Sequence, residues 1–205
     1  MRKALFTALF FVFCAPLAFA QDGDFKRGEF GVMFSHNRVD TDGAFSPDPN
    51  DTGRDGFNGV NIDAGYNFTR YVGAKADFSY HKKSRDFGAL VPGGESIKVD
   101  GKLTQFMGGI KIQDNATETR VRPFAQALFG LGHVSVDVTG NTTGLPNTNL
   151  SESETGFAAA VGGGLDIRIN RNIDFRAIKV EYNPVRIDGE TGNNIRLGVG
   201  LNFRF

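Results

Sequence analysis

The chain has 205 residues, with 23 basic and 23 acidic side chains and a formal net charge of zero. This balance gives no reason to expect a nucleic-acid partner. Its 20 Phe and 27 Gly favour strands and tight turns over helices.

The first twenty residues have the features of a secretory signal peptide. Arg2 and Lys3 precede an apolar stretch over residues 4–15, and Ala18-Phe19-Ala20 forms a small-residue cleavage site. The apolar stretch is too short to span a bilayer as a helix, although an uncleaved anchor is the alternative. We therefore predict a signal peptide at residues 1–20 and one domain at residues 21–205. The only cysteine, Cys14, lies before the cleavage site, so the mature domain would contain no disulfide.

Eight segments alternate between apolar and polar residues, which is the pattern of strands with two unlike faces. The predicted strands are residues 29–39, 58–68, 71–81, 97–112, 121–138, 156–170, 173–187 and 194–205. In segment 97–112, Val99 and Leu103 are out of phase with the later residues, which predicts a β-bulge. In segment 173–187 the alternation slips after Ala177, and the early phase of segment 121–138 stays open.

The predicted connections alternate in length along the chain. Short connections fall at residues 69–70, 113–120 and 170–172, and long polar ones at residues 40–57, 82–96, 139–155 and 183–193. Short turns at one end and long loops at the other are typical of outer-membrane barrels. A soluble sandwich has no reason to sort its connections in this way.

Strands of about eleven residues match the length needed to cross a bilayer at a tilt. Because lipid cannot hydrogen-bond to backbone groups, the sheet must close on itself. We predict an all-β protein, an eight-stranded antiparallel up-and-down transmembrane barrel with a lumen filled by side chains. Its lumen charge network would contain Asp63, Lys75, Asp77, Lys111, Asp166, Arg168, Asp174, Arg176, Lys179, Glu181, Arg196 and Arg204. A soluble barrel with its apolar faces inward is the alternative.

The short connection at residues 170–172 predicts a register for its hairpin. Pairing Ile169 with Ile173 places Asp166 opposite Arg176 and Arg168 opposite Asp174, and it also places Leu165 opposite Ala177. Since an unpaired charge inside a narrow lumen would be costly, the two opposite-charge pairs favour this register.

Residues 121–138, 157–182 and 194–205 resemble the small outer-membrane β-barrel family of OmpA-like, OmpX-like and opacity-type bacterial proteins. The resemblance implies a bacterial outer-membrane location, contact with outer-membrane lipid, a monomeric state and no cofactor. In that family, alternating apolar residues that end in Phe resemble the signal read by the barrel-assembly machinery. On this chain the signal would be Val199, Leu201, Phe203 and Phe205.

One motif suggests catalysis. His133 and Ser135 would share a strand face with Asp137, and outer-membrane lipid hydrolases resemble this arrangement, with His133 as base, Ser135 as nucleophile and Asp137 as orienting group. The structural interpretation, a polar strand end entering its loop, is the one we favour, so we assign no catalytic residue. His36 and His81 have no neighbours at metal-ligand spacing, and we predict no metal site.

The expected role is structural or surface-interactive, meaning adhesion or envelope integrity, with a surface or host ligand bound by the long loops. A small-solute porin is the alternative. An eight-stranded lumen filled by side chains would leave little room for a solute, since aqueous pores are found in barrels of about 16 or more strands.

Overall fold

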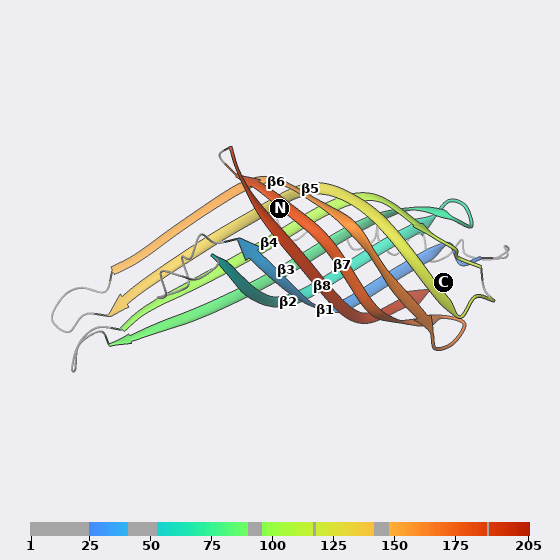
Figure 1. The fold of residues 1–205 in the computed structure, drawn as a ribbon, viewed down its shortest axis with the longest axis horizontal. Coiled ribbons are helices and arrows are strands. Elements are labelled where there is room, and N and C mark those ends of the chain that lie inside the picture. The colour runs from blue at the N-terminus through green and yellow to red at the C-terminus, as the bar shows by residue number, and fades with distance from the viewer. Residues whose placement is uncertain (1–24, 41–52, 90–95, 117, 142–147, 188) are drawn as a thin grey trace, which may run out of the picture.

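The computed structural model describes residues 25–40, 53–89, 96–116, 118–141, 148–187 and 189–205, and the predicted signal peptide lies outside these ranges. Eight strands form one closed antiparallel barrel in chain order, and β8 closes it against β1 (Figure 1). The strands are β1 (Gly28–Asp40), β2 (Arg54–Asn67), β3 (Val72–Ala89), β4 (Ser96–Gln113), β5 (Val121–Asn141), β6 (Thr148–Arg168), β7 (Ile173–Ile187) and β8 (Glu190–Arg204). In the described ranges, no helix has the length and apolar character needed to cross a membrane.

The outer surface of the barrel is apolar and its interior is polar. On β8, Leu197 and Leu201 are 42% and 40% exposed, whereas Arg196 between them and Arg204 near the strand end are almost fully buried. A protein that folds in water would place these side chains the other way round. The predicted barrel, with apolar faces toward lipid and charges inside, is confirmed.

Four strands continue past the rest of the barrel at one end. The β2–β3 pairing stops at Lys82, and the β6–β7 pairing begins only at Phe157. The parts of β3 to β6 beyond these points stay paired with one another, and Figure 1 shows them running out past the other strands. We call this extension the protruding sheet and define it as residues 83–89, 96–104, 133–141 and 148–156.

The protruding sheet corrects the prediction of long loops at residues 82–96 and 139–155, because most of both segments is strand. These segments lie beyond the band of exposed apolar side chains that faces lipid, so their sequences do not alternate between apolar and polar residues. The predicted loop at residues 183–193 is also wrong, since β7 and β8 pair up to Ile187 and Glu190. Gly189 adopts a φ of 90° in the connection, a conformation that glycine reaches without steric cost.

The bulge predicted for β4 is absent at Val99 and Leu103, and the only shift in its described pairing with β3 lies near the strand end, between Asp86 and Ala89 of β3. The slip predicted for β7 is confirmed. Strand β4 pairs with β5 from end to end without a shift, and Leu103 is buried because it belongs to an apolar layer inside the upper barrel. In β7 the register shifts between Arg176 and Lys179. The hairpin pairs Asp166 with Arg176 as predicted, but Leu165 lies opposite Ile178 because of this bulge.

The run Gly162-Gly163-Gly164 allows the strands beside β6 to approach closely. A Cβ atom added to Gly162 or Gly163 would lie 2.1 Å from the carbonyl oxygen of Val180 or 2.2 Å from that of Phe124. Side chains cannot be accommodated at such distances, so glycine at these positions reflects close packing of the backbone.

Candidate functional site

The interior of the barrel is the most distinctive feature of the described chain, because it holds many ionised side chains out of contact with water. The cations are Lys75, Lys111, Arg122, Arg176, Lys179, Arg196 and Arg204, and the anions are Glu29, Asp63, Asp77, Asp166, Asp174 and Glu181. We keep the name lumen charge network for these residues. The two signs nearly balance, which a low-dielectric interior requires.

Arg176 on β7 is the centre of the middle layer. Its guanidinium donates two hydrogen bonds to Asp166, at 2.7 and 3.0 Å, and a third to Asp63 at 3.0 Å. Lys75 binds the same Asp63 at 3.0 Å. The ring of Phe124 lies against both cations, 4.5 Å from the guanidinium carbon and 5.5 Å from the ammonium nitrogen. This apolar aromatic side chain is favourable inside the lumen because its face attracts cations.

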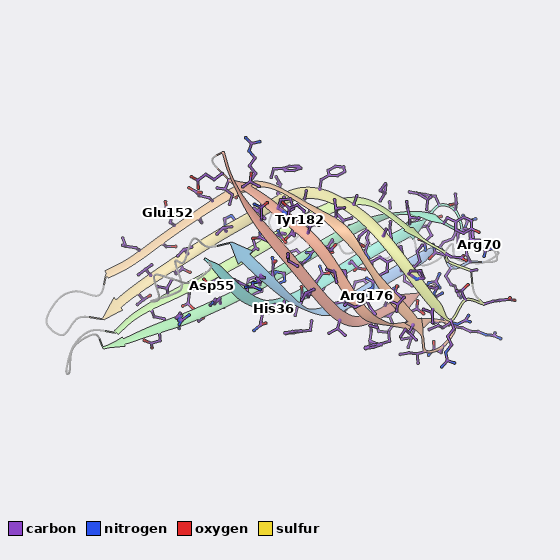
Figure 2. The ribbon with its side chains drawn as sticks, in the orientation of Figure 1. His36, Asp55, Arg70, Glu152, Arg176 and Tyr182 are labelled. Atoms are coloured by element: carbon purple, nitrogen blue, oxygen red, sulfur yellow. The ribbon has the colours of Figure 1, made fainter. Side chains whose placement is uncertain are left out.

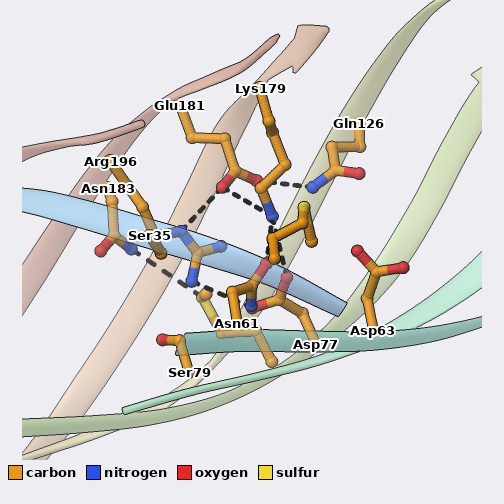
Figure 3. Close-up of polar contacts among 12 residues, drawn as sticks. Ser35, Asn61, Asp63, Asp77, Ser79, Gln126, Lys179, Glu181, Asn183 and Arg196 are labelled. Atoms are coloured by element: carbon orange, nitrogen blue, oxygen red, sulfur yellow. Dashed lines mark hydrogen bonds and ion pairs between the residues drawn. The ribbon is translucent and has the colours of Figure 1, made fainter. Parts of the chain in front are cut away.

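The upper layer is a four-membered ring of alternating charge (Figure 3). Lys179 lies 3.1 Å from both Asp77 and Glu181, and Arg196 lies 3.0 Å from Asp77 and 2.7 Å from Glu181. Asn61 accepts a further bond from Lys179 at 2.7 Å. Each charge therefore has two partners of opposite sign, drawn from strands β3, β7 and β8.

The lower layer lies at the end of the short turns. Lys111 is bonded to Glu29 and donates to Gln113 at 2.9 Å, and the amide of Gln113 donates to Asp166 at 3.1 Å. In the same layer, Asp174 pairs with Arg122. Gln113 thus connects the lower layer to the middle one.

Above the charged layers the interior becomes neutral and then apolar. His81 and Ser35 are 2.9 Å apart, and the Gln105 amide donates to Asn183 at 2.9 Å. Buried apolar side chains lie alongside and above this polar layer: Phe57, Leu103, Met107, Leu128, Ala158, Ala160 and Val185. The described interior is therefore occupied by side chains over the height of the barrel.

Every residue predicted for the lumen lies in the network except Arg168. Its side chain is only half-buried at the barrel rim, where it donates a hydrogen bond to the backbone carbonyl of Glu118. Sequence reasoning missed Glu29 and Arg122. Glu29 could have been found, because it alternates in step with Gly31 and Ser35 on the face opposite the apolar residues of its strand. Arg122 was harder to place, because the lumen-facing side of its strand also carries the apolar residues Phe124 and Leu128.

The structure does not bring His133, Ser135 and Asp137 together as a catalytic unit. His133 is exposed above the apolar band, and its Nδ1 atom lies 2.9 Å from the hydroxyl of Thr155. Asp137 is bound by Lys102 at 2.7 Å and by the Ser151 hydroxyl at 2.6 Å. The acidic group is thus engaged by two other partners, and the histidine has a hydrogen-bond partner on the neighbouring strand.

The outer face of the protruding sheet carries ion pairs. Lys98 in this sheet and Lys82, which directly precedes it on β3, lie 3.5 and 3.3 Å from the Asp100 carboxylate. Hydrogen bonds from Ser84 and Lys82 lower the pKa of Asp100, and hydrogen bonds from Lys102 and Ser151 lower the pKa of Asp137. Figure 2 shows how far this sheet, marked by Glu152, lies from the turn end marked by Arg70. Polar groups at an exposed end, above a closed interior, suit contact with other molecules.

Comparison with known proteins agrees with this architecture. The sequence profile of the outer membrane protein beta-barrel domain family matches residues 5–205. The solved structure of Ail, the attachment invasion locus protein of Yersinia pestis, in complex with the heparin analogue sucrose octasulfate, is similar. Its TM-score is 0.61 at 17% identity, over 88% of this chain and 99% of Ail.

Neisserial surface protein A is also similar, with a TM-score of 0.51 at 16% identity over 87% of this chain and 97% of that protein. At these identities the likeness is one of fold. No curated protein matches the chain in sequence. The chain belongs to the outer membrane protein beta-barrel domain family and is a bacterial outer-membrane protein.

Proposed function

We propose that this barrel is a structural and surface-interacting protein of the outer membrane, which serves adhesion or envelope integrity and contacts its partners through the protruding sheet and the adjoining connections. The observation that carries the proposal is the division of the molecule into a closed ionic interior and a polar sheet that extends past the barrel. Ail, which is named for attachment, has the same fold, and that likeness is consistent with the proposal.

The alternative function, a small-solute porin, requires an aqueous path. The ring of Asp77, Lys179, Glu181 and Arg196 crosses the lumen, with ion-pair distances of 2.7–3.1 Å. An ion could pass only by breaking several of these contacts at once. We expect the purified barrel to produce no unitary current steps in planar bilayers under conditions where a 16-stranded porin conducts. Regular single-channel steps from the wild-type protein would favour the porin.

Trimming the protruding sheet tests the proposed role. Residues 84–100 and 137–151 can each be replaced by Asn-Gly, because Lys83 lies opposite Gly101 and Val136 opposite Glu152, so that a two-residue turn fits the register. We expect the trimmed barrel to fold in the membrane, while adherence of expressing cells to host-cell or matrix surfaces falls to the level of cells without the protein.

The matched control shortens the β7–β8 hairpin at the same end of the barrel, with Asn-Gly in place of residues 187–190. Adherence should be retained in this variant. If cells with the trimmed sheet adhere and resist detergent as well as cells with the wild-type protein, the proposed surface role loses its support.

We also propose that Val199, Leu201, Phe203 and Phe205 form the segment through which the barrel-assembly machinery recognises the chain. The supporting observation is that Val199, Leu201 and Phe203 are 38–40% exposed on the outer face of β8, where a partner can reach them before the barrel closes.

A further inference from the structure

The end of the barrel that carries the short turns is strongly basic. Its described residues outside the lumen include six cations and two anions. The cations are Lys26, Arg27, Arg70, Arg120, Arg168 and Arg171, and the anions are Asp114 and Glu118. The protruding sheet at the other end differs, because Lys98 and Lys102 each lie beside an aspartate, as does Lys82 next to the sheet. Short turns face the periplasm in outer-membrane barrels, so the excess charge lies on the periplasmic side.

Backbone hydrogen bonds fix these arginines at one level around the rim. The carbonyl of Arg27 accepts from Asn67, that of Arg70 from Asn115 and that of Arg120 from Arg168. The carbonyl of Asn172, next to Arg171, accepts from Arg204. Each bond joins neighbouring strands or turns, so the arginines follow one another around the circumference. Arg27, Arg70, Arg120 and Arg171 all have exposed side chains.

This belt of arginines lies at the edge of the apolar band. Arg120 directly precedes Val121, which is 49% exposed on the outer face, and Arg171 follows Ile169, which is 61% exposed. A guanidinium nitrogen of Arg27 lies 3.4 Å from the Tyr66 hydroxyl. Residues next to the last lipid-facing side chains lie at the depth of lipid headgroups.

We propose that this belt, named the arginine rim and defined by Arg27, Arg120 and Arg171, binds the phosphate groups of anionic phospholipids in the inner leaflet of the outer membrane. Guanidinium groups bind phosphate with two parallel hydrogen bonds. Phosphatidylglycerol and cardiolipin are preferred over zwitterionic lipids because cations outnumber carboxylates among the described residues at this end, where Asp114 is already bonded to Arg70. The leaflet surrounds the rim, so the ligand is always within reach.

Arg70 is left out of the definition because Asp114 holds it with two hydrogen bonds, at 2.8 and 3.0 Å. These bonds from Arg70 lower the pKa of Asp114 to about 2, so the pair stays ionised at physiological pH. Its opposite charges leave little net attraction for a phosphate.

The test compares lipid selectivity in reconstituted vesicles of phosphatidylcholine with spin-labelled phosphatidylglycerol or phosphatidylcholine as probe. Both leaflets contain the probe, so the direction of insertion does not matter. The wild-type barrel should prefer the anionic probe by up to about fivefold per engaged arginine. Arg27→Gln, Arg120→Gln and Arg171→Gln combined should remove the preference. The control, Arg38→Gln, Lys98→Gln and Arg186→Gln combined, removes three exposed cations at the other end and should retain it.

Heat-modifiable migration on gels verifies that all three proteins are folded before selectivity is compared. Equal affinity of the wild-type barrel for both probes would overturn the proposal, as would equal loss in the rim variant and the control. The third arm is cosedimentation with purified peptidoglycan sacculi. If the rim variant loses sacculus binding but keeps its lipid preference, the rim serves the periplasmic polymer and the phospholipid site is rejected.

Discussion

The Arg176→Ala barrel is expected to lose about 3–5 kcal/mol of unfolding free energy, the largest effect of any single substitution considered for this chain. The alanine leaves Asp63 and Asp166 without their shared partner in a region that water does not reach. An uncompensated charge in such a place costs much more than the original pair contributes. The chain has no tryptophan, so circular dichroism of the vesicle-bound barrel during urea unfolding is the suitable measurement.

Arg168→Ala is the matched control for this prediction. Arg168 lies on the adjacent strand of the same hairpin, but its side chain is half-buried and bonds to the carbonyl of Glu118. Its replacement should cost about 1 kcal/mol or less. A double variant with Arg176→Met and Asp166→Asn should recover much of the loss, because the two removed charges balance and Asp63 keeps its ion pair with Lys75 at 3.0 Å. Equal costs for Arg176→Ala and Arg168→Ala would contradict an electrostatic role of the network.

The sequence was sufficient for those parts of the fold in which the membrane imposes a pattern. Wherever a strand has lipid on one side and the lumen on the other, a residue that faces lipid has to be apolar and one that faces the lumen is usually polar. The face of each residue in β2, β3 and β8 could therefore be predicted from the alternation. The charge pair of Asp166 and Arg176 followed from the same rule, because a two-residue slip would have left both of them unpaired.

The parts that could not be predicted lie where this constraint ends. Beyond the apolar band both faces of β3 to β6 meet water or other polar groups, so residues 82–96 and 139–155 carried no alternation that would distinguish strand from loop. Inside the lumen, Phe124 and Leu103 were misleading for a different reason. A filled interior accepts an apolar side chain when it stacks on a cation or belongs to an apolar layer, and neither situation is visible in a single strand.

Phe203→Ala is expected to reduce the amount of folded barrel in the outer membrane of living cells severalfold, while leaving spontaneous refolding into detergent micelles unchanged. The reason is that recognition by the assembly machinery is needed only in the cell. Phe175→Ala is the matched control, since Phe175 and Phe203 are both 38% exposed on the outer face of neighbouring strands. Membrane levels are measured by immunoblot of the heat-modifiable form, and refolding by the same gel shift in vitro.

Phe205 requires a separate comparison because it also has a packing role. Its backbone exchanges hydrogen bonds of 2.8 and 3.0 Å with Gly28, and its ring occupies the space where a Cβ on Gly28 would lie. Phe205→Ala should therefore reduce membrane levels and also slow refolding in micelles, whereas Phe203→Ala reduces only the former. If Phe203→Ala and Phe175→Ala reduce membrane levels equally, the outer face of β8 has no special part in assembly, and the loss reflects the general contribution of lipid-facing aromatic rings.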